Sequence, residues 1–186
     1  MALLSAQAIK RLGFATVGKD VRISDRASFY GAQRIHLGSH VRIDDYCVLS
    51  AGSGGIEIGS YIHVAVYTSL IGAGRIRLHD FCNVSSRVSI YSSSDDYSGR
   101  TMTNPMVPDE LKSVKHAPVE VGRHVVIGCG AVVLPGVELE DGVAVGALSL
   151  VSSSCAAFGI YAGIPARRVA ERSRDLLELE RRFPPV

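Results

Sequence analysis

The chain has 186 residues, 47% of them hydrophobic and 20% charged, which suits one folded domain with a sizeable core and excludes a disordered chain. Its 20 basic and 18 acidic residues leave a formal net charge of +2, too balanced for a protein that binds nucleic acid through its overall field. No apolar stretch is long enough to span a membrane, so we expect a soluble protein. Its four widely spaced cysteines suggest neither a zinc site nor a disulfide framework, so we expect it in the reducing cytoplasm.

Residues 1–14 carry apolar side chains at the spacing of a short amphipathic helix, over residues 3–12. The basic residues come late in this segment and no small-residue cleavage site follows, so a secretory signal peptide is not indicated. We expect this helix to cap the open end of the fold that follows against edge pairing.

Apolar residues then recur at every sixth position, each followed by a small or acidic residue. The most regular set is Val121, Ile127, Val133, Leu139, Val145 and Val151. An amphipathic helix would instead need apolar returns after three and four residues. Three hexads close a triangular coil of about 18 residues, and stacked coils pair their short strands in parallel. The spacing predicts an all-β solenoid over residues 15–158, a parallel β-helix of hexapeptide repeats, whose short three-sided coils are typical of the left-handed form.

The six-residue period is interrupted at three places. Residues 53–55 and 72–74 are rich in glycine and lengthen two corners by about two residues each. Residues 91–118 form a much longer interruption, and long loops in a compact solenoid are usually functional. This excursion loop can lie over the groove between two subunits, so we expect it to form a wall of the substrate site.

Residues 159–186 complete the single expected domain, which spans residues 1–186. Leucines in a charged stretch predict a helix over residues 171–183, and Arg167 and Arg168 come just before it.

Residues 125–137, with the sequence VVIGCGAVVLPGV, and the GIPAR motif that begins at Gly163 resemble the hexapeptide-repeat acetyltransferases. This family includes the galactoside, maltose and xenobiotic acetyltransferases and sugar acetyltransferases of bacterial surface polysaccharides. The resemblance covers most of the chain beyond about Ser24. It implies a left-handed β-helix, a homotrimer, acetyl-CoA as donor, and transfer of an acetyl group to a hydroxyl or amine of a sugar or nucleotide-linked sugar in surface-polysaccharide biosynthesis.

The resemblance also implies where CoA binds. In these enzymes CoA lies in the groove between neighbouring prisms of the trimer, and its pantetheine amides bond backbone groups at corners one coil apart. Cys129 and Ala147, 18 residues apart, match those corners. A nucleophilic role for Cys129 is the less favoured alternative, because no paired histidine accompanies it.

Further residues of the donor site follow from the same comparison. Ser152 and Ser153 match corner residues further along the groove. Arg167 or Arg168 would contact the CoA phosphates through the guanidinium fork, the alternative being a solvated arginine pair.

The general base is the point at which the sequence departs from the familiar pattern. In the galactoside and xenobiotic enzymes a histidine of the excursion loop removes the acceptor proton. Asp95 stands roughly in its place here. Counting the bulge at residues 72–74, His63 falls one coil below Asn83 on an outward face that leads to the loop. We therefore predict a catalytic pair of His63 and Asp95.

Asn83, Asp96, Tyr97 and His116 are predicted to line the acceptor site, with His116 as a second candidate base. Alternatively, His63 bonds only at a subunit interface and an amine acceptor needs little basic help. Two other classes of function stay open, a zinc enzyme like the γ-type carbonic anhydrases and a non-catalytic trimeric solenoid, although we expect no metal site.

Overall fold

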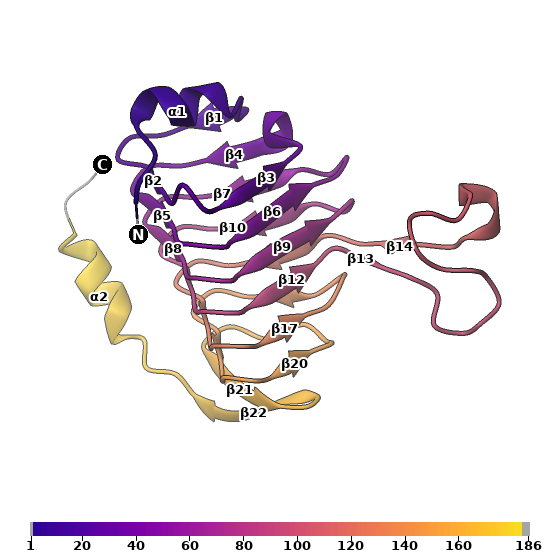
Figure 1. Cartoon of the computed structure of the whole chain (residues 1–186). Helices are drawn as coiled ribbons and strands as arrows, with labels where there is room; N and C mark the ends of the chain where they lie inside the picture. Colours follow the sequence, from indigo (N-terminus) through magenta and orange to yellow (C-terminus); the bar gives the residue numbers. More distant parts are fainter. Residues whose placement is uncertain (1, 184–186) are drawn as a thin grey trace.

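The computed structural model describes residues 2–183 and winds them into a left-handed parallel β-helix, as the hexad spacing predicted (Figure 1). Each coil contributes one strand to each of three sheets, which we call sheets 1, 2 and 3. All neighbouring strands of these sheets run parallel except the last pair of sheet 2, β21 and β22. Within the described residues, no helix has the length and apolar character required to span a bilayer.

The strands of the three sheets are short and follow one another in the same order in every coil. Sheet 1 contains β1 (Thr16–Val17), β4 (Ile35–Leu37), β7 (Ile56–Ile58), β10 (Ile76–Leu78), β15 (Val119–Val121) and β18 (Glu138–Leu139). Sheet 2 contains β2 (Arg22–Ile23), β5 (Val41–Ile43), β8 (Ile62–Val64), β11 (Asn83–Val84), β16 (Val126–Ile127), β19 (Ala144–Val145), β21 (Gly159–Gly163) and β22 (Ala166–Glu171). Sheet 3 contains β3 (Ser28–Tyr30), β6 (Val48–Ala51), β9 (Ser69–Gly72), β12 (Ser89–Tyr91), β17 (Val132–Val133) and β20 (Leu150–Val151).

The core is a set of aliphatic columns inside the prism. In sheet 2 the register stacks five hexad residues, all at most 3% exposed: Ile43, Val64, Val84, Ile127 and Val145. Full burial of one such side chain contributes about 1.5–3 kcal/mol relative to leaving it exposed. The regular apolar positions are therefore architectural, and function has to come from the corners and the loop.

The coils are longer before the excursion loop than after it. Ile35 pairs with Ile56, 21 residues later, whereas Glu120 pairs with Glu138, 18 residues later. The additional residues lie at the corner that leads from sheet 3 back to sheet 1, which we call the third corner. Gly72 ends β9 at this corner, and a side chain there would be strained, because its φ is +147° and a Cβ would lie 2.8 Å from the Ser93 backbone nitrogen.

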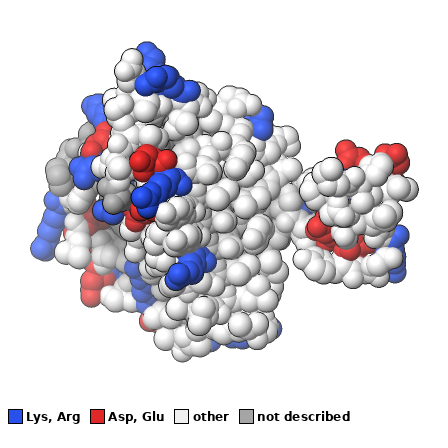
Figure 2. Space-filling view, in the orientation of Figure 1, with Lys and Arg blue, Asp and Glu red and all other residues white. Residues whose placement is uncertain are grey.

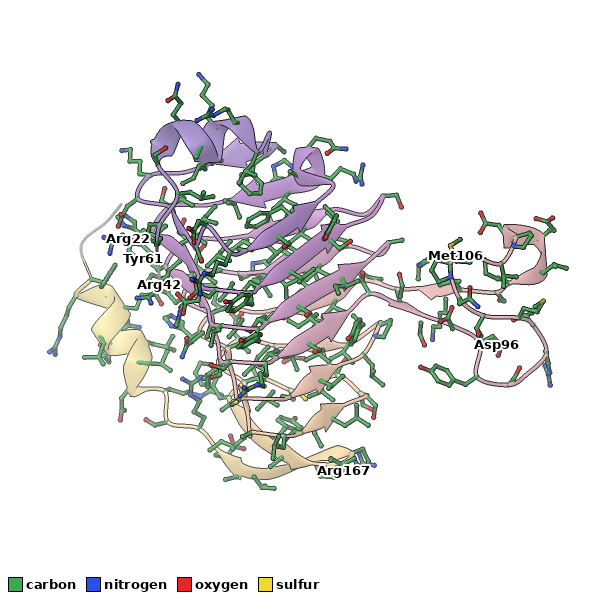
Figure 3. All side chains as sticks on the ribbon, in the orientation of Figure 1. Arg22, Arg42, Tyr61, Asp96, Met106 and Arg167 are labelled. Carbon is green, nitrogen blue, oxygen red and sulfur yellow. The ribbon has the colours of Figure 1, made fainter. Side chains whose placement is uncertain are left out.

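The excursion loop leaves from this same third corner. It starts after β12, forms a two-stranded antiparallel ribbon from β13 (Ser93–Ser94) and β14 (Lys115–His116), and contains the short 3-10 helix η2 (Asp109–Leu111). The loop projects away from the prism, with Asp96 and Met106 far from the coils (Figures 1 and 3). Its surface carries several exposed apolar side chains: Tyr97, Met102, Met106 and Leu111.

Both ends of the solenoid are covered. Helix α1 (Ala6–Arg11) lies over the first coil, is capped by Ser5, and buries Ile9, which confirms a short N-terminal helix. At the other end, β21 and β22 form a hairpin that precedes helix α2 (Asp175–Arg181). The expectation of a helix from residue 171 was wrong at its start, because residues 166–171 pair with β21 instead.

Two of the three corners carry columns that include non-glycine residues in the left-handed backbone conformation. At the first corner, between sheets 1 and 2, four rings stack with centroids 4.6, 5.1 and 4.8 Å apart: His40, Tyr61, Phe81 and His124. Phe183 packs across Tyr61 and Phe81 nearly at right angles, so we call this set the covered column.

The second corner, between sheets 2 and 3, carries a similar column that no described segment covers, which we call the open column. Tyr46 and Tyr67 stack with centroids 5.0 Å apart, and the guanidinium groups of Arg26 and Arg87 lie over their outer faces at 5.6 and 5.5 Å. Both tyrosines are exposed, at 44% and 49%.

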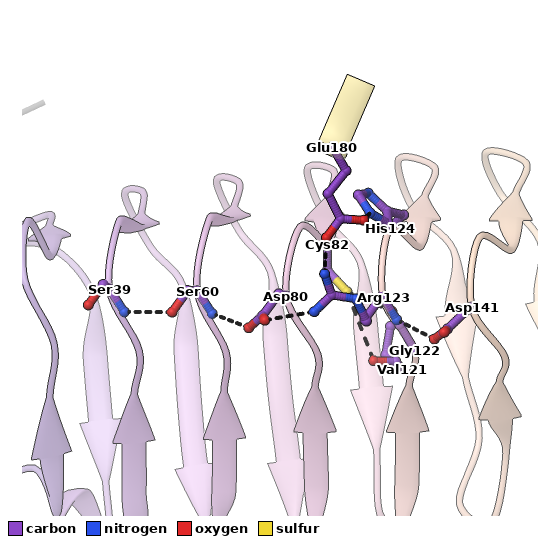
Figure 4. Close-up of polar contacts among 10 residues, drawn as sticks. All are labelled: Ser39, Ser60, Asp80, Cys82, Val121, Gly122, Arg123, His124, Asp141 and Glu180. Atoms are coloured by element: carbon purple, nitrogen blue, oxygen red, sulfur yellow. Dashed lines mark hydrogen bonds and ion pairs between the residues drawn. The ribbon is translucent and has the colours of Figure 1, made fainter. Parts of the chain in front are cut away.

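Side chains at the first corner also bind the backbone of the neighbouring coil (Figure 4). The N–H of Ser39 donates to the Ser60 hydroxyl at 3.1 Å, that of Ser60 to the Asp80 carboxylate at 2.8 Å, and that of Arg123 to the Asp141 carboxylate at 2.7 Å. These bonds satisfy N–H groups that the strands leave free at the corner.

Candidate active site

The last coils of the second corner carry Cys129 and Ala147, whose backbone groups are expected to bind the acyl donor. We call this part of the second corner the donor corner. Cys129 and Ala147 lie one coil apart, since the N–H of Leu148 donates to the Cys129 carbonyl at 2.8 Å. Adjacent coils approach so closely that a Cβ on Gly128 would lie 2.5 Å from the Ala147 nitrogen. Within residues 2–183 the N–H groups of Cys129 and Ala147 donate no hydrogen bond. These two backbone N–H groups are therefore free to donate to a ligand.

Cys129 is exposed, whereas the other three cysteines are buried. Burial raises the pKa of Cys47 to about 11, of Cys82 to about 12 and of Cys155 to about 11. Those three remain thiols near neutral pH. Cys129 therefore stands apart as the accessible sulfur at the donor corner.

Ser152 and Ser153 occupy a different corner from Cys129 and Ala147. They follow β20 and lie at the third corner, whereas Ala147 precedes β20 at the second corner. Within one chain, sheet 3 therefore separates these two serines from Cys129 and Ala147, and their contact with CoA stays a prediction. The two serines are exposed on the far edge of sheet 3.

The two arginines of the C-terminal hairpin lie at the end of the donor corner. Arg167 pairs in register with Ala162, whose Cβ lies 3.1 Å from where a Cβ on Gly146 would be. Arg168 forms an ion pair with Glu171. Figure 3 shows Arg167 projecting at the last coil, and of these two arginines only Arg168 forms an ion pair within residues 2–183.

His63 does lie one coil from Asn83 in sheet 2, as the sequence predicted. Its partner is not Asp95, however. The His63 Nε2 atom lies 2.8 Å from the Asp44 carboxylate, which also accepts from Arg42 at 2.7 Å. Burial acts to raise the pKa of Asp44, but the hydrogen bonds from His63 and Arg42 outweigh it and hold that pKa below its ordinary value.

The predicted His63–Asp95 pair is therefore not formed within one described chain. His63 faces outward from sheet 2, whereas the loop that carries Asp95 leaves from the third corner, on the opposite edge of sheet 3. A single-chain count of coils could not detect this, because it gives the height of a residue along the prism and not the face on which it lies.

The loop residues differ in how many hydrogen bonds their side chains form within the loop. Asp96 accepts from the Ser98 N–H at 2.8 Å, the Ser98 hydroxyl at 2.9 Å and Thr101 at 3.1 Å, and the bonds from Ser98 lower its pKa. Its carboxylate thus holds the loop together. Asp95, directly after β13, is exposed and forms no side-chain bond within residues 2–183.

Tyr97 and His116 complete the predicted loop set. Tyr97 is 93% exposed, and the His116 Nδ1 atom lies 2.7 Å from the Ser93 hydroxyl across the ribbon.

Sheet 3 separates the loop from the donor corner, and its outer face is uncharged. The outward residues of its strands are Ser28, Tyr30, Val48, Ser50, Ser69, Ile71, Ser89, Tyr91, Val132 and Leu150. Figure 2 shows this face as a broad area almost free of Lys, Arg, Asp and Glu, beside a charged loop. Among the described residues, no three His, Cys, Asp or Glu side chains lie close enough together to hold a metal ion.

A left-handed hexapeptide β-helix with one excursion loop and free backbone N–H groups at a corner is the architecture expected of a hexapeptide-repeat acyltransferase. The comparisons with known proteins agree. The chain is 54% identical over 185 residues to a dTDP-4-amino-4,6-dideoxy-D-glucose acyltransferase of Escherichia coli, covering 100% of this chain and 96% of the relative. It is 27% identical over 125 residues to an Escherichia coli K12 protein named as a putative lipopolysaccharide biosynthesis O-acetyl transferase, covering 66% and 61%.

Solved structures give the same result. A single-residue mutant of AntD, an N-acyltransferase from Bacillus cereus, superposes with a TM-score of 0.93 at 42% identity, covering 98% of both chains, in a complex with dTDP and coenzyme A. A maltose O-acetyltransferase from Clostridium difficile shares the fold alone, with a TM-score of 0.61 at 19% identity over 90% of this chain and 75% of that one. No protein-family model matches the chain. The chain belongs to the hexapeptide-repeat acyltransferases and is an acyltransferase.

Proposed function

We propose that this enzyme transfers an acyl group from a CoA thioester, acetyl-CoA in the simplest case, to the amino group of a dTDP-linked 4-amino-4,6-dideoxyglucose or a close analogue. The observation that carries the proposal is 54% identity over the whole chain to an enzyme named for that substrate. An AntD variant bound to dTDP-4-amino-4,6-dideoxyglucose and coenzyme A has 41% identity to this chain and a TM-score of 0.93. This narrows the hydroxyl-or-amine alternative to the amine.

In the proposed reaction the free amine attacks the carbonyl carbon of the thioester. A C–N bond forms, the C–S bond breaks, and the proton lost by nitrogen ends on the departing sulfur, so that the products are an amide and the CoA thiol. Only the uncharged amine carries the lone pair, and a carboxylate beside it can accept a proton from the ammonium form. Asp95 is suited to this role, because its carboxylate is exposed and not engaged by the loop.

We further propose that the active site is shared between copies in a homotrimer. Asp95 and the donor corner lie on opposite edges of sheet 3, so one chain does not bring them together. A neighbouring copy packed against the uncharged face of sheet 3 would place its loop over the donor corner. The exposed apolar side chains of the loop, with Met106 90% exposed, fit such an interface.

The other predicted site residues take their places in this arrangement as proposals. The backbone of Cys129 and Ala147 would bond pantetheine, Arg167 would meet the CoA phosphates, and His63, held by Asp44, would face the acceptor together with Asn83. The free N–H groups of Cys129 and Ala147 support the proposed bonds to pantetheine. We place the reaction in the cytoplasm and its product in surface-polysaccharide assembly.

The test is a coupled measurement of thiol release and product mass. With acetyl-CoA, we expect N-acetylation of dTDP-4-amino-4,6-dideoxyglucose and no transfer to the 4-hydroxy sugar nucleotide or to a simple glycoside. Asp95→Asn should lower kcat at least about tenfold with unchanged CoA affinity. The control is Asp109→Asn, an exposed loop carboxylate paired with Lys112. Transfer to the hydroxy sugar at an equal rate would contradict the proposal.

A further inference from the structure

The two ring columns of the solenoid are built alike, but only one has an occupant within the described chain. In both, a residue with a left-handed backbone donates its N–H to the carbonyl that precedes the equivalent residue of the neighbouring coil, as Tyr61 does to Ser39 and Tyr67 does to Asp45. The covered column is closed by Phe183 and α2. The open column is left with its ring edges exposed to solvent.

The covered column shows what kind of group fits such a surface. The faces of its rings are used in stacking, so Phe183 packs its own face across the edges of Tyr61 and Phe81, at 89° and 88° to them. One coil further, the Glu180 carboxylate bonds Arg123 and lies 2.7 Å from the His124 ring nitrogen (Figure 4). The occupant is therefore a planar ring followed by an anion.

The open column also offers a surface of ring edges and, one coil later, a cation that can bind an anion. The edges of Tyr46 and Tyr67 form the flat surface, and Arg87 follows one coil later. Arg26 is engaged at the other end, because it donates to the Tyr46 hydroxyl at 2.9 Å and lies in the field of Asp45 and Asp25. Arg87 forms no ion pair within residues 2–183, so its charge is available to an anion.

The next coil of the same corner holds the donor backbone. The N–H of Gly130 donates to the Ser86 carbonyl at 2.9 Å, which places Cys129 and its free N–H directly after Arg87 along the corner. Stacked coils are about 4.8 Å apart, so ring edges, cation and donor backbone follow one another over about 15 Å. A nucleobase, a diphosphate and a sugar are joined in this order in a sugar nucleotide.

We propose that the open column is the nucleotide half of the acceptor site: the base packs across the edges of Tyr46 and Tyr67, and the diphosphate binds Arg87. The inference rests on the proposed function and adds to it the surface that recognises a nucleoside diphosphate. Arg26 is a positioning residue that holds Tyr46. With the nucleotide in these earlier coils, the sugar amine lies at the donor corner, and CoA occupies the later coils that carry Cys129 and Ala147.

The test compares thymidine, dTMP and dTDP as calorimetric probes of the intact protein. Arg87→Ala should weaken dTDP at least about tenfold and leave thymidine unchanged, because only the phosphates meet the guanidinium. Tyr67→Ala should weaken all three, whereas Tyr67→Phe should bind like the wild type, since the ring edge is retained. Arg77→Ala is the matched control, an outward arginine of the same coil on sheet 1. CoA affinity and oligomer mass should stay constant throughout.

The outcomes separate this inference from the proposed function. Wild-type acyl transfer to the amino sugar nucleotide together with unchanged dTDP binding by Arg87→Ala and Tyr67→Ala would overturn the open column alone. Dissociation of the oligomer by Tyr67→Ala, with dTDP affinity retained, would make the column an interface between copies and likewise overturn it. No transfer and no dTDP binding by the wild type would overturn the proposed function itself.

Discussion

Cys129 is the accessible thiol among four cysteines and lies where the donor is proposed to bind. We expect iodoacetamide at about pH 8 to label Cys129 and not the other three, whose raised pKa values keep them protonated and whose burial keeps them out of reach. Acetyl-CoA, which has no free thiol, should protect Cys129. Peptide mass spectrometry reads out the labelled position.

The matched control for this experiment is Cys129→Ser, which should take up no label. AMP should give no protection, since it lacks the pantetheine arm. Labelling of Cys129 at the same rate with and without acetyl-CoA would place the donor elsewhere.

Individual site residues were only partly predictable. Counting residues along the repeat predicts that His63 and Asn83 lie one coil apart, and the structure confirms this pairing. The partner of His63 was not predictable, because Asp44 belongs to a neighbouring coil of a different length and the exact corner insertions had to be known. Asp96 stays a predicted binding residue, and the sequence did not show that its carboxylate also bonds Ser98 and Thr101 within the loop.

Helix α2 is fastened to the first corner by one acidic side chain. Glu180 bonds His124 and Arg123, and these bonds, against a smaller effect of burial, hold the pKa of Glu180 below its ordinary 4.5. A carboxyl with a lowered folded pKa stabilises fully above its unfolded value and loses that contribution as the pH falls through the folded value. We expect hydrogen-exchange protection of α2 to be constant from about pH 7 to 5 and to fall below about 4.5.

Glu180→Gln should reduce this protection already at neutral pH, while strands such as β16 remain protected. Glu178→Gln is the control, because Glu178 pairs with Arg181 on the exposed side of the same helix. Equal protection of α2 in all three proteins at pH 7 would show that Phe183 and the hairpin hold the helix without the ion pair.

The whole molecule is proposed to be active only as an assembly, which predicts complementation between two inactive variants. His63→Ala removes the corner side of the site and Asp95→Asn removes the loop side. If these sides come from different copies, trimers that contain both variants regain about a third of wild-type activity, because one of their three sites joins two intact halves.

Co-expression with two affinity tags isolates the mixed species for this assay. Each variant alone should stay at least about tenfold below the wild type at equal oligomer mass. No recovery in the mixed trimers would mean that His63 and Asp95 act from one chain or that one of them is dispensable.

The sequence by itself determined the solenoid, because a sixfold apolar period fits a three-sided coil and no helix. It also determined the bounds of the excursion loop and the one-coil spacings of His63 with Asn83 and of Cys129 with Ala147, since these depend only on counting along the chain. Only the tertiary structure decided which face each residue occupies: the His63–Asp44 pair, the uncharged face of sheet 3 between loop and donor corner, and the open column beside the covered one. The physical reason is that a repeat fixes heights along the prism, whereas contacts around it depend on the length of every corner and on what the C-terminal segment covers.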